Sequence, residues 1–159
     1  MGACDHVRVL ELAGGVAGPF FGKLLAGLGA DVLKVEPPTG DQTRREGPFP
    51  GDVPQAEQSG QFLHLNTNKR GLTLNLQTAA GKAILDRLLV GADLAIVDWR
   101  PADLVALGFD LAELRQRFPR LVLVSVTGFG VAGPYADYPA SDLVASALSG
   151  YLAPTAHQG

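Results

Sequence analysis

Residues 7–36 read VRVLELAGGVAGPFFGKLLAGLGADVLKVE, and the expected architecture follows from this one stretch. Residues 7–12 form a short apolar run just before two glycines, which is typical of a buried parallel strand entering a tight turn. Pro19 suits the first turn of a helix, and Gly29 can close that helix in the left-handed conformation. Residues 31–36 form a second strand that ends at two prolines. The stretch therefore predicts a βαβ unit with a right-handed crossover.

The helix of this unit carries large apolar residues at helical spacing. We expect them to form one face that packs on the sheet. These residues are Phe20, Phe21, Leu24, Leu25 and Leu28.

The alternation of strand and helix continues along the chain. Further strands are expected over residues 71–76, 93–97 and 121–126. Further helices are expected between Thr78 and Gly91, over residues 101–107, between Asp110 and Pro119, and over residues 142–151. This order predicts an α/β fold, with a Rossmann-like, mostly parallel sheet and helices on both faces.

Two segments depart from this alternation. Residues 39–61 are polar, rich in Gly and Pro, and without periodicity, so we expect a long surface loop there. No strand is predicted in residues 154–159 to follow the helix over residues 142–151. We therefore expect residues 1–159 to be a fragment of a larger domain, or a chain that a partner completes.

The composition narrows the classes of function. The net charge of −3 gives no broad basic surface, so we expect no nucleic-acid partner. The single Cys4 cannot form an internal disulfide, and His6, His64 and His157 lack the spacing of metal ligands, so we expect no metal. The first residues do not form a signal-peptide pattern, and no apolar run is long enough to span a membrane. We expect a cytoplasmic protein with no membrane partner.

The turn after the first strand comes close to a dinucleotide-binding motif. Ala13, Gly15 and Gly18 differ from GxGxxG by one substitution, and Glu36 stands near the place of the ribose-binding acid. Backbone N–H groups at such a helix start favour a phosphate. Three interpretations stay open: the NAD-binding half of an oxidoreductase, a site for another phosphate ligand, and a plain tight turn.

Cations and an aromatic residue follow other strand ends, where open α/β sheets bind their ligands. Trp99 offers a face for an adenine ring, and Arg100 can hold a phosphate with two hydrogen bonds. Arg44, Arg45 and Lys69, taken singly, are better explained as solvated surface cations.

The loop that begins at Gly128 is rich in glycine, which allows either close approach of a ligand or simple turns. Asp142 lies at the start of the helix expected after this loop, and we interpret it as a helix cap rather than a catalytic carboxylate.

Taken in order, six strings resemble the family III coenzyme A transferases, the group that includes formyl-CoA and carnitine-CoA transferases and the α-methylacyl-CoA racemases. The strings are VLELAGGVAGPF, LLAGLGADVLKVEPPTGDQTR, FLHLNTNKRGLTLNL, DWRPADLVALGF, PRLVLVSVTGFGVAGPY and SDLVASALSG. They are collinear and cover nearly the whole chain, so they are far more specific than one glycine motif.

The resemblance implies the N-terminal, CoA-binding lobe of a two-lobed acyl-CoA enzyme that forms an interlocked homodimer. The family moves CoA between an acyl-CoA and a carboxylic acid through an Asp-linked covalent intermediate. That Asp is expected beyond Gly159, so no catalytic residue is expected here and the isolated chain should be inactive. The CoA contacts that the resemblance implies are Val16, Ala17, Pro38, Leu72, Asp98, Trp99, Arg100 and Thr127.

The chain also departs from the family pattern. Ser141 precedes Asp142 where the racemases carry a His, which favours the transferase branch over a racemase-like member. Ala106 stands where transferases often carry an Arg, and Asp98 would repel a nearby phosphate. These two losses keep open a non-catalytic, degenerate CoA- or nucleotide-binding module.

Overall fold

Five parallel strands form one sheet in the computed structural model, which describes residues 2–152. The strands are β1 (Arg8–Glu11), β2 (Asp31–Glu36), β3 (Arg70–Thr73), β4 (Leu94–Val97) and β5 (Val122–Ser125). Their order is β3-β2-β1-β4-β5, and every neighbouring pair is parallel. The strand order reverses direction between β1 and β4, as in dinucleotide-binding folds. The predicted α/β, Rossmann-like class is confirmed.

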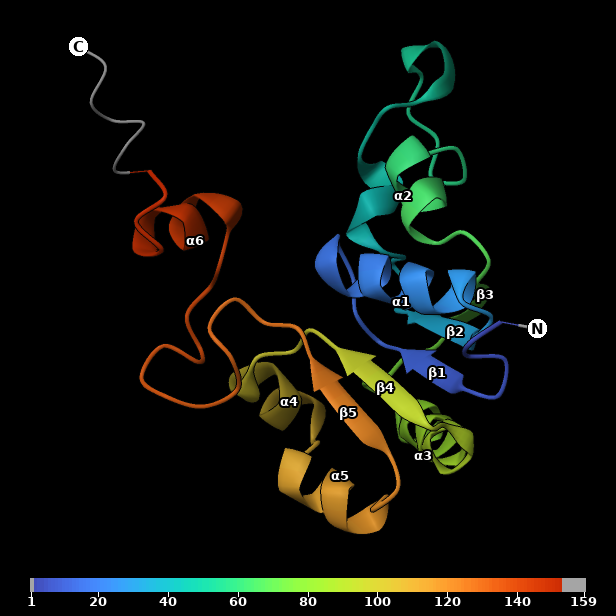
Figure 1. Cartoon of the computed structure of the whole chain (residues 1–159), viewed down its shortest axis with the longest axis vertical. Helices are drawn as coiled ribbons and strands as arrows, with labels where there is room; N and C mark the ends of the chain where they lie inside the picture. Colours follow the sequence, from blue (N-terminus) through green and yellow to red (C-terminus); the bar gives the residue numbers. More distant parts are fainter. Residues whose placement is uncertain (1, 153–159) are drawn as a thin grey trace.

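Helices cover both faces of the sheet (Figure 1). They are α1 (Ala17–Gly27), α2 (Gly60–Leu65), α3 (Ala79–Gly91), α4 (Pro101–Leu107), α5 (Leu111–Arg117) and α6 (Asp142–Leu148). The helix α2 was not expected from the sequence pattern. In Figure 1, α6 stands apart from the sheet, and it buries none of its residues. Residues 154–159, for which the sequence predicts no strand, lie outside the described residues. Within residues 2–152, no helix is long and apolar enough to cross a membrane.

Side chains alternate between two cores because successive strand residues point to opposite faces. Leu10 and Leu12 pack with α3, α4 and α5 in the larger core, which includes the fully buried Leu85. Val9 and Ala13 pack with α1 in the smaller core.

The face that α1 buries differs from the expectation. Phe21 and Leu25 pack on the smaller core, but Phe20, Leu24 and Leu28 are 44%, 50% and 50% exposed. The buried positions of the helix are instead mostly small: Gly18, Pro19, Gly22 and Ala26. Because these small residues bring the helix close to the sheet, the large side chains are displaced to its flanks and only part of them is covered.

The segment over residues 39–61 holds two short 3₁₀ helices, η1 (Gln42–Arg45) and η2 (Pro50–Asp52). Asp41, Thr43 and Ser59 are buried. The Ser59 hydroxyl lies 2.6 Å from the carbonyl oxygens of both Thr43 and Glu46 and accepts the Phe62 N–H at 3.1 Å. These contacts tie the two ends of the segment to each other and to α2.

Candidate functional site

Two adjoining pockets open at the carboxyl edge of the sheet. We call the first the apolar pocket; it has a volume of about 390 Å³ and is lined by Leu74, Trp99 and Leu107 among others. The second, the polar pocket, has about 340 Å³ and reaches from Gly14 and Gly15 to Arg45. Leu12, Val35, Glu36, Pro37 and Trp99 line both. The pockets lie beside the point where the strand order reverses, which is where open α/β sheets bind ligands.

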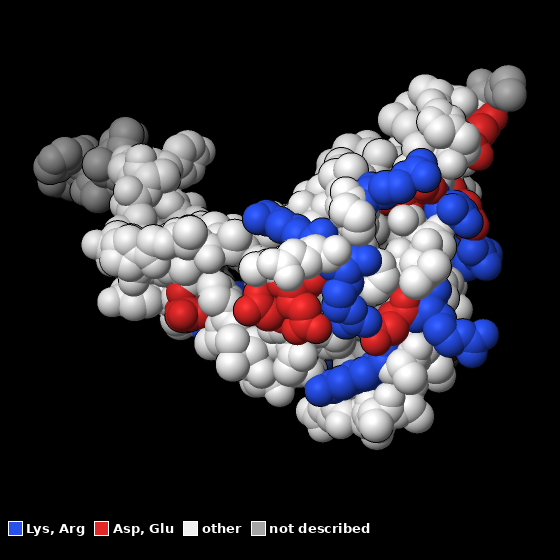
Figure 2. Space-filling view, turned by 90° about the horizontal axis from the view of Figure 1, so that it is seen from below, with Lys and Arg blue, Asp and Glu red and all other residues white. Residues whose placement is uncertain are grey.

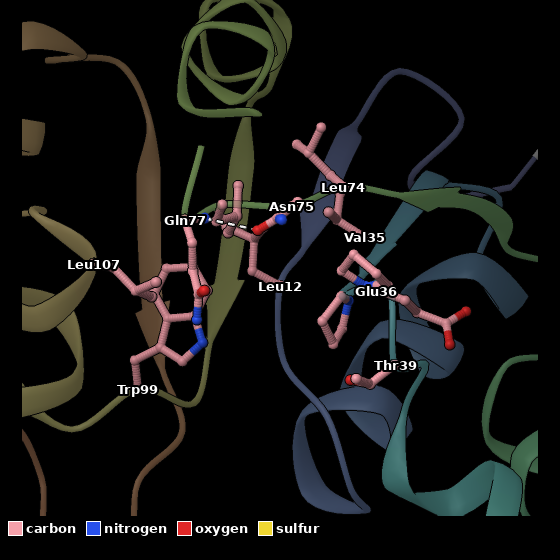
Figure 3. A pocket seen from close by; sticks show the side chains of 12 residues that line it. Leu12, Val35, Glu36, Thr39, Leu74, Asn75, Gln77, Trp99 and Leu107 are labelled. Atoms are coloured by element: carbon pink, nitrogen blue, oxygen red, sulfur yellow. Dashed lines mark hydrogen bonds between the residues drawn. The ribbon is translucent and has the colours of Figure 1, made fainter. Parts of the chain in front are cut away.

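The apolar pocket has an aromatic wall. In Figure 3, Trp99 and Leu107 lie on one side of it, and Val35 and Thr39 lie on the other. The Trp99 ring is held in place because it stacks on Phe109, with ring centroids 6.1 Å apart and an interplanar angle of 13°. A planar, weakly polar ring can enter between these walls and contact the indole.

The turn before α1 does not offer its glycine amides to a ligand. The Gly14 N–H donates to Asp98 Oδ2 at 2.8 Å, and the Gly15 N–H donates to Asp41 Oδ1 at 3.4 Å. A Cβ at Gly18 would collide with Ala13, so this glycine serves the close packing of α1 on the segment that follows β1. Two carboxylates therefore occupy the amides on which a phosphate was expected.

Glu36 is also engaged within the protein. Arg44 donates to its two carboxylate oxygens at 2.7 and 2.8 Å, and the Asp41 N–H donates at 2.9 Å. Burial alone would raise the pKa of Glu36, but the hydrogen bonds and charge of Arg44 outweigh burial and lower it. In Figure 3 the Glu36 carboxylate points away from the apolar pocket. A ribose diol would have to displace Arg44, so the geometry does not favour the NAD interpretation.

A buried charge cluster adjoins the polar pocket. It is formed by Glu11, Lys34, Asp41 and Lys69, of which Lys34 and Asp41 also line the pocket. Lys34 Nζ lies 3.2 Å from Glu11 Oε1 and 2.8 Å from Asp41 Oδ2. Lys69 Nζ lies 2.8 Å from Glu11 Oε2 and donates to the Pro19 carbonyl at 2.7 Å. Burial lowers the pKa of Lys69, while the Glu11 carboxylate acts in the opposite direction.

The expectation that Lys69 and Arg44 are solvated surface cations is wrong. The Lys69 side chain is only 2% exposed, and Arg44 is paired with Glu36. The sequence shows only that Glu11 and Lys34 each lie within an apolar strand run. The structure makes them register partners on the face that α1 covers. Opposite charges at such paired positions stabilise each other.

A third pocket has a volume of about 400 Å³ and is lined by Asp98, Arg100 and Thr127 among others. Asp98 also lines the polar pocket. Burial raises the pKa of Asp98, against the lowering effect of the Gly14 N–H and the Lys34 charge. Arg100 pairs with Asp103 at 2.8 Å. The Thr127 hydroxyl is buried and has no hydrogen-bond partner within residues 2–152.

The eight contacts expected from the resemblance are thus distributed unevenly. Pro38 and Trp99 line the apolar pocket, and Asp98, Arg100 and Thr127 line the third pocket. Val16 and Ala17 lie exposed at the start of α1, outside these three linings.

Leu72 packs against the larger core, and Leu74, two residues further on, lines the apolar pocket in its place. Leu74, Gln77, Leu107 and Arg45 were not singled out as ligand contacts from the sequence. Their position after strand ends or at helix ends was the available signal. In the part of the chain that the structure describes, no group of three His, Cys, Asp or Glu side chains could hold a metal ion.

Comparison with known proteins decides the family, because the chain matches CoA-transferase family III over residues 5–159. The chain belongs to this family. Among its relatives is the succinyl-CoA:(R)-benzylsuccinate CoA-transferase subunit BbsE of Thauera aromatica, to which it is 46% identical over 148 residues. The alignment covers 93% of this chain and 36% of that protein. It is 40% identical over 153 residues to a formyl-CoA:oxalate CoA-transferase of Streptomyces avermitilis, covering 96% of this chain and 36% of that protein.

Solved structures agree with the fold. A CAIB/BAIF family protein from Brucella suis superposes with a TM-score of 0.83 at 36% identity, covering 94% of this chain and 39% of that one. A protein from Mycobacterium tuberculosis gives the same TM-score of 0.83 and identity of 36%, with 95% and 41% covered. The resemblance to family III is therefore confirmed. The family III chain described here spans between 35% and 39% of the length of the curated relatives.

Proposed function

We propose that this chain is the CoA-binding lobe of a transferase that moves CoA between an acyl-CoA and a carboxylic acid. The observation that carries the proposal is the pair of pockets at the reversal point of a family III sheet, with Trp99 and Leu107 forming a wall for the adenine ring. CoA is the substrate in this proposal.

The proposed chemistry divides the reaction between this lobe and residues outside it. Under the proposal, an Asp beyond Gly159 attacks the thioester carbonyl and releases the CoA thiolate, which leaves a mixed anhydride. The thiolate then attacks the Asp carbonyl of the anhydride and releases the acyl group as a carboxylate, which gives an enzyme–CoA thioester. The lobe binds and orients CoA, with Pro38, Asp98, Trp99, Arg100 and Thr127 at or beside the pockets. The interlocked homodimer is part of the same proposal for the longer protein.

One observation supports the transferase branch over the racemase branch. Ser141 is the N-cap of α6, and its side chain accepts the Val144 N–H at 3.3 Å. A hydroxyl in this capping position is no substitute for the imidazole that proton transfer in a racemase would use. The interpretation of Asp142 as the helix cap is wrong, because Ser141 is the cap. Asp142 lies exposed in the first turn of α6, where a carboxylate still favours the helix start.

The binding test uses the single tryptophan of the chain, Trp99, as its own reporter. Titration with CoA is expected to change the Trp99 fluorescence in a saturable way, at micromolar concentrations. Thr39→Phe fills the apolar pocket from an exposed position and should weaken the response, whereas Val53→Phe, on an exposed loop residue, should leave it unchanged.

The competing interpretations give different results in the same titration. No saturable response to CoA would favour the degenerate module, and preference for NAD over CoA would favour the oxidoreductase half. Incubation with an acyl-CoA and a carboxylic acid is expected to give no CoA exchange by the chain alone. Sustained exchange would contradict the placing of the reacting Asp beyond Gly159.

A further inference from the structure

The cations that line the two pockets differ in whether a carboxylate already pairs with them. Lys34 lies within salt-bridge distance of Glu11 and Asp41. Arg45 lines the polar pocket, but within residues 2–152 it makes no ion pair. Its Nη1 donates to the Thr39 carbonyl at 3.1 Å, and its side chain is exposed. Arg45 therefore keeps most of its five N–H donors for a ligand.

The backbone that carries Arg45 is held on a rigid element. Asp41 caps η1, because its carboxylate accepts the Thr43 N–H at 2.9 Å, and the same carboxylate is paired with buried Lys34. Arg44, the preceding residue, is fixed by its two hydrogen bonds to Glu36. Because the backbone of this position is fixed, the Arg45 guanidinium can reach a ligand without a rearrangement of the segment, which favours recognition.

Other groups at the polar pocket are poor partners for an anion. Asp98 and Asp41 occupy the amides of Gly14 and Gly15. The charge of Lys34 is balanced by the carboxylates beside it. An anionic group that enters this pocket therefore meets Arg45 as its free cation.

We propose that Arg45 is the phosphate-recognition residue of this site. It donates two parallel hydrogen bonds to a phosphate of the nucleotide while the base lies against Trp99 in the adjoining pocket. Planar guanidinium donors match the oxygens of a phosphate in this way. The inference rests on the proposed CoA binding and adds the residue that selects the phosphorylated form of the ligand.

The test compares the full 159-residue chain with Arg45→Met and Arg45→Lys, using Trp99 fluorescence and two probes, CoA and adenosine. Arg45→Met should weaken CoA binding by about 10- to 100-fold, the usual loss for a hydrogen bond to a charged group. Binding of adenosine, which has no phosphate, should not change. The CoA affinity of Arg45→Lys should lie between those of the unmodified chain and Arg45→Met, because lysine keeps the charge and loses the paired donors. Arg115→Met on α5 removes an equal charge outside the pockets and should leave both affinities as they are.

Dephospho-CoA identifies the phosphate concerned. If the effect of Arg45→Met disappears with this probe, Arg45 binds the 3′-phosphate, and if it persists, Arg45 binds the diphosphate; either result supports the role. Unchanged CoA binding by Arg45→Met, or an equal loss for adenosine, would overturn the inference alone. Absence of CoA binding by the unmodified chain would overturn the proposed function as well.

Discussion

The carboxylate of Asp98 accepts the backbone N–H of Gly14 at 2.8 Å, so the residue after β4 fixes the turn after β1. Burial raises the pKa of Asp98, and the nearby Asp41 carboxylate raises it further, against the lowering by the Gly14 N–H and Lys34. A carboxyl group with a higher pKa in the folded chain favours folding at low pH, and this contribution is lost as the pH rises through the folded-state pKa.

Asp98→Asn is therefore expected to be more stable than the unmodified chain at pH about 7, with a difference that shrinks as the pH falls toward the ordinary Asp pKa of about 4. The Asn side chain keeps an oxygen for the Gly14 N–H. Urea unfolding midpoints across this range measure the difference. Asp103→Asn is the matched control with the opposite sign, because hydrogen bonds from Arg100 lower the pKa of Asp103. A difference that widens on acidification would contradict the account.

Lys69 and Arg70 are adjacent in sequence but form ion pairs in opposite environments. Lys69→Met removes one of the two cations that pair with the buried Glu11 carboxylate. It should therefore lower the free energy of unfolding by about 3–5 kcal/mol. Arg70→Met breaks an exposed pair with Asp31 and should cost about 0–1 kcal/mol. Chemical denaturation of both variants measures the contrast. Equal losses of unfolding free energy in the two variants would mean that water reaches the charge cluster.

Two glycines of α1 should respond oppositely to alanine. A Cβ at Gly22 would collide with the Glu11 carboxylate, so Gly22→Ala should destabilise the protein by about 1–3 kcal/mol. A Cβ at Gly27 meets nothing within 4 Å, so Gly27→Ala should stabilise the helix by about 0.5–1 kcal/mol. Thermal unfolding of the two variants gives the signs. Stabilisation by Gly22→Ala would show that α1 can shift away from the sheet.

Two threonines give a further matched pair. The Thr43 hydroxyl donates to Asp41 at 2.8 Å, and Thr43→Val should cost about 1.5–3 kcal/mol because that hydrogen bond is to a charged group. The Thr127 hydroxyl is buried without a partner in residues 2–152, so Thr127→Val should be neutral or stabilising. Calorimetry with and without CoA separates the roles. If Thr127 contacts CoA as proposed, Thr127→Val weakens CoA binding although it leaves the fold intact, and unchanged binding would remove Thr127 from the site.

Local patterns were sufficient for the strands and most helices. The apolar runs, the glycine with positive φ at residue 29 and the capping residue Thr78 all act within a few neighbouring residues, and the structure agrees with them to within a few residues at each end. The sequence pattern did not predict α2, because a helix of six residues is too short to show a clear periodicity. The apolar spacing in α1 predicted a helix correctly and its buried face only in part, since small residues also pack.

By itself, the sequence determined the order of strands and helices, the family and the presence of Trp99 at a strand end, because each of these depends on residues close together along the chain or on the order of motifs. Only the tertiary structure decided which charges are buried and which amides are free. Lys69 meets Glu11 across 58 residues of sequence, and Asp98 meets Gly14 across 84. Such partners are chosen by the packing of α1 and the long segment over the sheet, and no local spacing encodes that packing.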